Sequence, residues 1–201
     1  MATSDAWGKE WISSCFDKLS DDAVVTSVVD IGCGDGTYSR LMRRNAQFWT
    51  GIEVWGPYVE EFKLRELYDQ VIVSDARFID PGMFAADVVI LGDVLEHMNE
   101  YEGMCLLSDI LKANSTFNGL TVIICVPMLH LEQDAVNDNP FEMHRMCNHY
   151  SEERMDRAVA WVTKAHGGVT VDKLVGDVVG YWVVRRGTHT EVQLPNAAPV
   201  A

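Results

Sequence analysis

The sequence contains no long apolar run, and this absence limits where the protein can lie. None of its runs approaches the roughly 18–20 uninterrupted apolar residues that a membrane-spanning helix needs. The first residues include Asp5, Lys9 and Glu10, so they lack the basic and then apolar pattern of a signal peptide. We therefore expect no membrane contact and a cytoplasmic location.

Paired cysteines are also missing. The five cysteines are odd in number and widely spaced, with no C-x-x-C pair: Cys15, Cys33, Cys105, Cys125 and Cys147. This spacing predicts reduced thiols, most of them buried, rather than a disulfide framework.

Basic residues are scarce. Lys and Arg number 16 against 30 Asp and Glu, which gives a formal charge of −14. Such a field repels polyanions, so nucleic acid could bind only at a strong local basic patch. The best candidate patch, Arg40, Arg43 and Arg44 on one helical face, fits a solvated helix surface better. We therefore expect no nucleic-acid partner, and the oligomeric state stays open.

The chain length and the order of its elements indicate one α/β domain. A chain of 201 residues suits a single domain, and we expect it over residues 1–186, with an amphipathic helix over about 4–19 and a loose tail over 187–201. Apolar strand patterns at about 24–31, 48–54, 70–74, 86–91 and 120–126 alternate with helical patterns at about 37–46, 57–68 and 99–113. This alternation predicts right-handed crossovers and a parallel sheet.

The C-terminal part has a different pattern. After a helix near 151–166, two apolar runs at 169–175 and 178–184 follow almost back to back. A crossover helix cannot fit between them, so they predict an antiparallel hairpin. The whole is therefore a mostly parallel seven-stranded sheet that ends in a hairpin.

A glycine-rich stretch follows the first predicted strand. Asp30 is followed by Gly32, Gly34 and Gly36, and a helical pattern then begins. Glycine suits a tight turn where a side chain would keep a ligand from the backbone and where φ is positive. A dinucleotide fingerprint, G-x-G-x-x-G, would place its third glycine at position 37, where this chain has Thr37.

The pattern Asp30-x-Gly32-x-Gly34-x-Gly36 resembles the first motif of the class I methyltransferases, which bind S-adenosylmethionine. The resemblance covers about residues 24–127 and, in outline, the hairpin. It implies a Rossmann-like three-layer sandwich and S-adenosylmethionine as cofactor. It also implies that Asp30 orients the glycine loop and receives the ammonium group of the methionine.

Polar residues at the other strand ends are the next candidates, since ligands of open α/β sheets lie beyond the carboxyl ends of the strands. Glu53 ends the second strand, where a carboxylate can accept hydrogen bonds from both hydroxyls of a ribose. The resemblance implies that Glu53 binds the ribose of the cofactor. The alternative is that Glu53 is simply a carboxylate on the surface. Val54 and Trp55 could flank adenine, although Trp55 fits the core equally well.

The third and fourth strands end in further matches to the family. Asp75 and Ala76 match its adenine contact, although aspartate is also a common turn residue. Asp93, in Asp93-x-x-Glu96-His97, resembles the segment that lies beside the methionine moiety. Together these residues make up the predicted cofactor site.

Methyl transfer from a sulfonium is an in-line displacement, for which alignment alone can supply about 7–11 kcal/mol. A base adds roughly 10²–10⁴-fold where the acceptor must lose a proton. The long connection over about 127–150 is the predicted acceptor side. Our candidate bases are His97, His130 and His144, with His149 as a further histidine of this connection. The histidines of the connection could instead form a hydrogen-bonded acceptor wall without proton transfer, and His97 could be structural. No metal site is predicted, because neither a helical H-x-x-x-H pair nor a tight ligand spacing occurs.

Two more specialised methyltransferase functions are excluded because their motifs would lie at other positions. Asn139-Pro140-Phe141 is similar to the motif of amino methyltransferases, but that motif ends the fourth strand, where this chain has Gly92-Asp93. The nucleophile of cytosine C5 methylation is missing, because Cys125 lies inside the fifth strand.

The sequence thus predicts a methyltransferase for a small or medium-sized acceptor, with oxygen favoured over nitrogen. The alternative is a module that binds S-adenosylmethionine or a nucleotide without catalysis and supports a partner. Nicotinamide-dependent oxidoreduction fails on the glycine spacing.

Overall fold

The computed structural model describes residues 6–22, 25–43, 46–114, 119–128, 132–136, 138–144, 151–187 and 193–195. Within these ranges seven strands form one sheet, in the order β3-β2-β1-β4-β5-β7-β6. The strands are β1 Ser27–Ile31, β2 Phe48–Glu53, β3 Gln70–Val73, β4 Val88–Gly92, β5 Gly119–Pro127, β6 Val169–Val175 and β7 Val179–Gly187. The first five are parallel, whereas β7 is antiparallel to both of its neighbours. The predicted parallel sheet with a terminal hairpin is confirmed.

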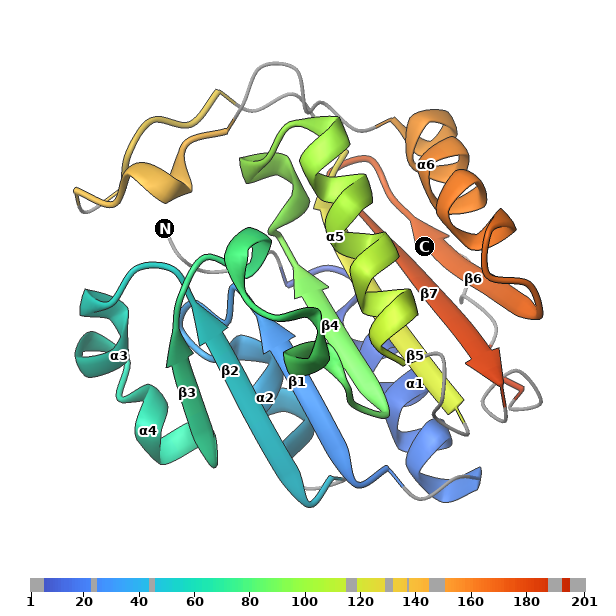
Figure 1. Cartoon of the computed structure of the whole chain (residues 1–201), viewed down its shortest axis with the longest axis horizontal. Coiled ribbons are helices and arrows are strands. Elements are labelled where there is room, and N and C mark those ends of the chain that lie inside the picture. The colour runs from blue at the N-terminus through green and yellow to red at the C-terminus, as the bar shows by residue number, and fades with distance from the viewer. Residues whose placement is uncertain are drawn as a thin grey trace.

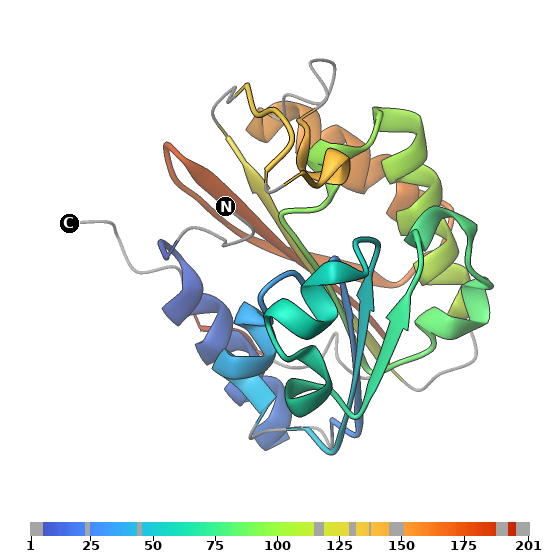
Figure 2. The same cartoon turned by 90° about the vertical axis from the view of Figure 1, so that its left-hand side faces the viewer.

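Helices cover both faces of this sheet and complete the predicted three-layer sandwich (Figures 1 and 2). One face carries α1 Lys9–Asp22, α2 Thr37–Met42, α3 Pro57–Glu61 and α4 Leu64–Leu67, and the other carries α5 Glu100–Ala113 and α6 Glu152–Lys164. Short 3₁₀ turns connect the layers: η2 Ala76–Phe78, η3 Pro81–Phe84, η4 Leu95–His97 and η5 Pro140–Glu142.

The alternation of side chains along the strands divides the core in two. On β1, Val28 packs with residues of α1 and α2, while Val29 and Ile31 pack with residues of α5. β5 is buried along nearly all its length because helices cover both of its faces. The strand ends are therefore the places where polar side chains can reach a ligand.

Several predicted helix boundaries were wrong. The first helix begins at Lys9 rather than near residue 4. The helix predicted over 57–68 is two helices, because Lys63 takes a left-handed conformation with φ of 54° and interrupts the hydrogen-bond ladder. α2 ends at Met42, where Arg43 follows as its C-cap.

The predicted loose tail is described only at 193–195, and there it is packed. Leu194 is buried with the core that α1 covers, and the Trp11 indole nitrogen donates to the carbonyl of Pro195 at 3.1 Å. At these residues the prediction of a loose tail was wrong. The rest of residues 188–201 lies outside the described part. A single sheet built by strands from residues 27 to 187 supports the proposal that residues 1–186 form one domain.

The structure also bears on the predictions about membrane helices and about the cysteines. In the described ranges, no helix is long and apolar enough to cross a membrane. Cys15, Cys33 and Cys125 are buried free thiols and Cys105 is an exposed one, as predicted, whereas Cys147 lies outside those ranges.

A capping box starts α5 directly after the η4 turn. The Asn99 side chain accepts from the backbone N–H of Glu102, and the Glu102 carboxylate accepts from the backbone N–H of Asn99. Replacing Asn99 with alanine is expected to lower the free energy of unfolding by about 1 kcal/mol. Urea denaturation measures this change, and Asn99→Asp should retain most of the stability because aspartate is also a good N-cap. Equal loss in both variants would contradict a capping role.

Candidate active site

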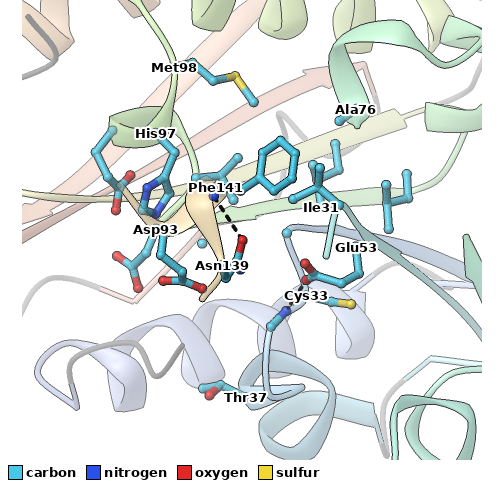
Figure 3. A pocket seen from close by; sticks show the side chains of 18 of the residues that line it. Ile31, Cys33, Thr37, Glu53, Ala76, Asp93, His97, Met98, Asn139 and Phe141 are labelled. Carbon is cyan, nitrogen blue, oxygen red and sulfur yellow. Dashed lines mark hydrogen bonds between the residues drawn. The ribbon is translucent and has the colours of Figure 1, made fainter. Parts of the chain in front are cut away.

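A cavity of about 490 Å³ opens at the carboxyl ends of β1, β2 and β4. In Figure 1 these strand ends point to the top, and the segments 132–136 and 138–144, drawn in gold, lie beyond them. Figure 3 shows Asp93, His97 and Met98 on one side of the cavity and Ile31, Glu53 and Ala76 on the other. Its volume is within the range of small-molecule sites, about 300–1,000 Å³.

The glycine loop after β1 forms one wall of the cavity. All three glycines have positive φ, 66° at Gly32, 49° at Gly34 and 79° at Gly36, as the sequence predicted. At Gly32 a Cβ would also lie 2.5 Å from a methyl group of Val94, so no other residue fits there. Gly32 and Gly34 line the cavity, whereas Gly36 lies behind them as the N-cap of α2. The contact of Gly36 with a ligand therefore stays a prediction.

Glu53 lies at the end of β2 and lines the cavity. Its carboxylate accepts the backbone N–H groups of Gly34 at 2.9 Å and Trp55 at 2.8 Å, which hold it in place. Burial raises its pKa, and these two hydrogen bonds oppose the rise. A carboxylate with two oxygens has lone pairs left for a ligand diol.

The residues after Glu53 differ in position. Val54 lines the cavity, whereas Trp55 does not. The Trp55 ring instead lies 6.4 Å, between centroids, from that of Phe141. Of the two interpretations left open for Trp55, the structure favours packing over contact with a ligand.

Asp75 and Ala76 line the cavity at the end of β3. The Asp75 side chain caps η2 through the Arg77 N–H and forms an ion pair of 2.5 Å with the Arg77 guanidinium. Burial raises the pKa of Asp75, but the hydrogen bonds from Arg77 outweigh it and the pKa ends below its ordinary value. The carboxylate is thus ionised and available at the rim of the cavity.

Asp93 follows β4 in a strained conformation, with φ of 55°. Its N–H donates to the Cys125 carbonyl at 3.0 Å, and the Cys125 thiol donates to its Oδ1 at 3.1 Å. Oδ2 is buried and has no hydrogen-bond partner among the described residues, although Asp93 lines the cavity. A buried acceptor without a partner fits an ammonium group on a ligand.

Asp30 does not itself line the cavity, so its contact with the ligand ammonium group stays a prediction. It is 1% exposed and accepts a hydrogen bond of 2.5 Å from the Tyr68 hydroxyl, beneath the glycine loop. Burial raises its pKa to about 7. The reason is the strand itself, because Asp30 shares the face of β1 on which Val28 packs under α1 and α2.

Glu96, His97 and His144 meet on the other side of the cavity. The first two belong to η4 after β4, and His144 ends the segment 138–144. The two imidazole rings lie 5.0 Å apart between centroids, and all three residues line the cavity. Burial, with the charges of Asp93 and Glu142, raises the pKa of Glu96, and burial lowers the pKa of His97 to about 4.

The histidine predictions had mixed outcomes. Of the three candidate bases, His97 and His144 come together, 47 positions apart in sequence, whereas His130 lies outside the described residues, as does His149. The predicted acceptor connection does reach the cavity, through Gln133, Asn139, Phe141, Glu142 and His144.

One wall residue had no sequence signal. Tyr38, in the first turn of α2, lines the cavity and packs against Gly92, where a Cβ would lie 2.0 Å from its ring. Lys9 at the start of α1 donates to the Tyr38 hydroxyl at 3.0 Å. Because helix periodicity marks Tyr38 simply as an apolar position, only the fold reveals its place in the site.

The cavity is strongly acidic. Six carboxylates line it: Asp35, Glu53, Asp75, Asp93, Glu96 and Glu142. Among its described lining residues Arg77 is the one Lys or Arg. Arg77 is itself bound to Asp75 and Glu102. The glycine loop, the Glu53 carboxylate that can accept from a diol, and the Asp93 oxygen without a partner together fit S-adenosylmethionine. Its sulfonium and ammonium groups are cationic, as an acidic cavity favours.

Residues 8–161 match the family model Methyltransf_23, described as a methyltransferase domain. The match covers most of the chain, so the chain belongs to this family and is a class I, S-adenosylmethionine-dependent methyltransferase. Family membership favours the enzyme over the alternative of a module without catalysis. No curated protein matches the chain.

Solved structures share the fold at low sequence identity. The plantazolicin methyltransferase BpumL in complex with S-adenosylhomocysteine has a TM-score of 0.64 at 13% identity, covering 89% of this chain and 82% of that one. Magnesium protoporphyrin IX methyltransferase from Synechocystis PCC 6803 has a TM-score of 0.60 at 15% identity, covering 89% of this chain and 83% of that one. A methyltransferase from Clostridium acetobutylicum ATCC 824 has a TM-score of 0.61 at 11% identity, covering 91% of this chain and 93% of that one. These likenesses support the Rossmann-like fold.

Proposed function

We propose that S-adenosylmethionine lies across the cavity with its ribose on Glu53 and its methionine end near Asp93. Adenine would contact Asp75 and Ala76, with Val54 at its flank. The proposal rests on the positions of these side chains at the ends of β2, β3 and β4, and on the glycine loop that brings the backbone to the ligand.

We further propose that the methyl group passes to an oxygen of a small or medium-sized acceptor. S-adenosylmethionine supplies a methyl group on a sulfonium: a lone pair of the acceptor oxygen forms the new O–C bond while the S–C bond breaks and leaves its electron pair on sulfur. The hydroxyl proton leaves on the side of the cavity where His97 and His144 lie. It passes either to a histidine nitrogen or to a group that the histidines bind. The protein itself aligns the acceptor oxygen with the methyl group and provides polar side chains around the acceptor.

The observation that carries this proposal is the meeting of His97 and His144 on the cavity wall. Their ring centroids are 5.0 Å apart, and a ligand atom of the buried Glu96 lies within 4.8 Å of theirs. In Figure 3, His97 lies on the opposite side of the cavity from Glu53. A hydroxyl acceptor must lose a proton to become a good nucleophile, whereas an unprotonated amine attacks as it is. Imidazole nitrogens at the acceptor end can take up that proton, so the site favours oxygen.

The cavity also limits the acceptor. Its volume of about 490 Å³ must hold both cofactor and acceptor, and Met98, Phe141 and Val179 give it apolar walls. Six lining carboxylates disfavour a polyanion. Two of the neighbours are named for plantazolicin and for magnesium protoporphyrin IX, which are very different compounds, so the fold does not itself select an acceptor.

A panel of phenols, aliphatic hydroxyls, carboxylic acids and amines tests the acceptor atom, with methyl-labelled S-adenosylmethionine as donor. We expect transfer to oxygen compounds. His144→Ala should lower turnover roughly tenfold or more while the affinity for S-adenosylhomocysteine stays within threefold, and His166→Ala, on a histidine outside the cavity, should change neither. Transfer confined to amines would refute oxygen as the acceptor atom.

We propose a cytoplasmic location on the basis of the thiols. The four described cysteines are unpaired, as is usual in a reducing compartment. Cell fractionation with an antibody to the native protein checks this, and recovery in an extracellular or membrane fraction would contradict it.

A further inference from the structure

The chain's histidine side has the composition of a metal site. One ligand atom from each of Glu96, His97 and His144 lies within 4.8 Å of the other two. Two imidazoles and one carboxylate, supplied by two separate segments, face the same cavity as the predicted cofactor residues. The sequence did not predict this group, because its members are too far apart along the chain.

Backbone contacts orient the candidate ligands. Nδ1 of His97 lies 3.3 Å from the carbonyl oxygen of Met143, so this nitrogen carries the proton and Nε2 keeps its lone pair. The segment that carries His144 is fixed by its own N–H, which donates to the Gln133 carbonyl at 3.0 Å, and by the Gln133 amide, which donates to the Glu142 carbonyl at 2.7 Å. The contact of the His97 ring is of the kind that orients a metal-binding histidine.

The local charge calls for a cation. Glu96 is 3% exposed, and Asp93 and Glu142 add negative charge beside it. Arg77, the one Lys or Arg among the described lining residues, is bound to Asp75 and Glu102. A buried cluster of carboxylates is costly to keep ionised without a nearby positive charge.

We propose that Glu96, His97 and His144 bind a divalent transition-metal ion of the Mn²⁺, Fe²⁺, Co²⁺ or Zn²⁺ type. Imidazole nitrogen favours these ions over Mg²⁺ and Ca²⁺, which prefer oxygen ligands. Bond lengths of about 2.0–2.2 Å would draw neighbouring ligand atoms to about 3 Å of each other, so the three side chains close in on the ion. Three protein ligands leave positions open for the acceptor.

This inference deepens the proposed function and rests on it for the identity of the acceptor. The open positions receive the acceptor oxygen, and coordination makes its hydroxyl more acidic. The proton then leaves to water, since both imidazoles are occupied. The ion also fixes the oxygen in line with the methyl group, which is the alignment that displacement requires.

Metal binding is measured directly on the full chain after treatment with EDTA and dialysis. Co²⁺ is titrated against visible absorption, and Mn²⁺ against heat in a calorimeter. We expect one ion per chain, with at least tenfold weaker binding in His144→Ala and in Glu96→Gln. His166→Ala is the matched control, because this histidine lies outside the cavity, and it should bind as the wild type does.

The variants remain interpretable if one is unstable. His144 lies on an irregular segment, and Glu96→Gln keeps the volume of a buried side chain. Wild-type protein that binds neither ion, or equal affinity in the wild type and both ligand variants, overturns the metal site.

Activity separates this inference from the proposed function. Oxygen methylation that continues unchanged in excess EDTA overturns the metal site and leaves the proposed function intact. Binding of one ion without transfer to any oxygen acceptor has the opposite meaning, because the metal site then stands and the acceptor proposal fails.

Discussion

Replacing Glu53 with alanine is expected to lower the affinity for S-adenosylhomocysteine by roughly 100-fold or more. A ribose diol can donate two hydrogen bonds to this carboxylate, and hydrogen bonds to charged groups contribute about 1.5–3 kcal/mol each. The carboxylate is buried at 4% exposure, so water competes poorly for these bonds. Isothermal titration calorimetry measures the change, and unchanged affinity would remove Glu53 from the cofactor site.

The same substitution disturbs the fold, and the experiment must separate the two effects. Glu53 also accepts the N–H groups of Gly34 and Trp55, which alanine leaves without this acceptor. Glu53→Gln keeps the side-chain shape and one oxygen, so it should fold better and still bind more weakly than the wild type. Glu60→Ala, at an exposed position on α3, is the matched control and should leave affinity unchanged.

The sheet could be predicted because its signals are local and strong. Unbroken apolar runs such as that of β4 exist only where both faces of a strand are buried, and each run ended close to its observed boundary. The break at Lys63 could not be predicted, because a lysine with positive φ has no pattern in sequence. Helix boundaries depend on such local conformations more than on apolar periodicity.

The two sides of the cavity differed in how far the sequence could predict them. Glu53, Asp75 and Asp93 each end a strand, so the rule for parallel sheets places them at one edge without knowledge of the loops. The pairing of His97 with His144 depends on how an irregular segment folds over that edge, which no periodicity encodes. The acceptor side is therefore defined by the three-dimensional fold and not by a pattern in the sequence.

Asp30 shows how a motif and a strand period can point to different positions. A motif match predicted contact with the ligand, yet the alternation of β1 already placed Asp30 on the face of Val28 rather than that of Val29 and Ile31. Reading the strand period together with the motif would have placed this carboxylate beneath the loop. Its charge still acts on the cavity from there, through space rather than by contact.

Replacing Asp30 with asparagine is expected to stabilise the ligand-free protein strongly at pH 8. Burial raises the pKa of Asp30 from an ordinary 3.8 to about 7, opposed by the Tyr68 hydroxyl and by Lys9 and supported by Glu53 and Asp35. The folded state therefore holds a proton that the unfolded state releases, so the contribution of Asp30 to stability is full below about pH 4 and is lost as the pH rises to about 7. At about 1.4 kcal/mol per pKa unit, the loss reaches at most about 4 kcal/mol.

Urea denaturation at pH 5 and pH 8 measures this difference. The asparagine variant should gain more over the wild type at pH 8 than at pH 5, whereas Asp109→Asn, on a carboxylate whose side chain is 42% exposed, should gain nothing at either. Equal gains of Asp30→Asn at both values would show that Asp30 is not titrating between them.

The ligand should reverse the sign of this effect. A bound molecule that carries an ammonium group favours the ionised form of Asp30, so wild-type affinity for S-adenosylhomocysteine should rise between pH 6 and pH 8. In Asp30→Asn this rise should be smaller, and affinity at pH 8 should fall. A buried acid that destabilises the empty protein and strengthens cofactor binding would explain why a charge stands beneath the glycine loop.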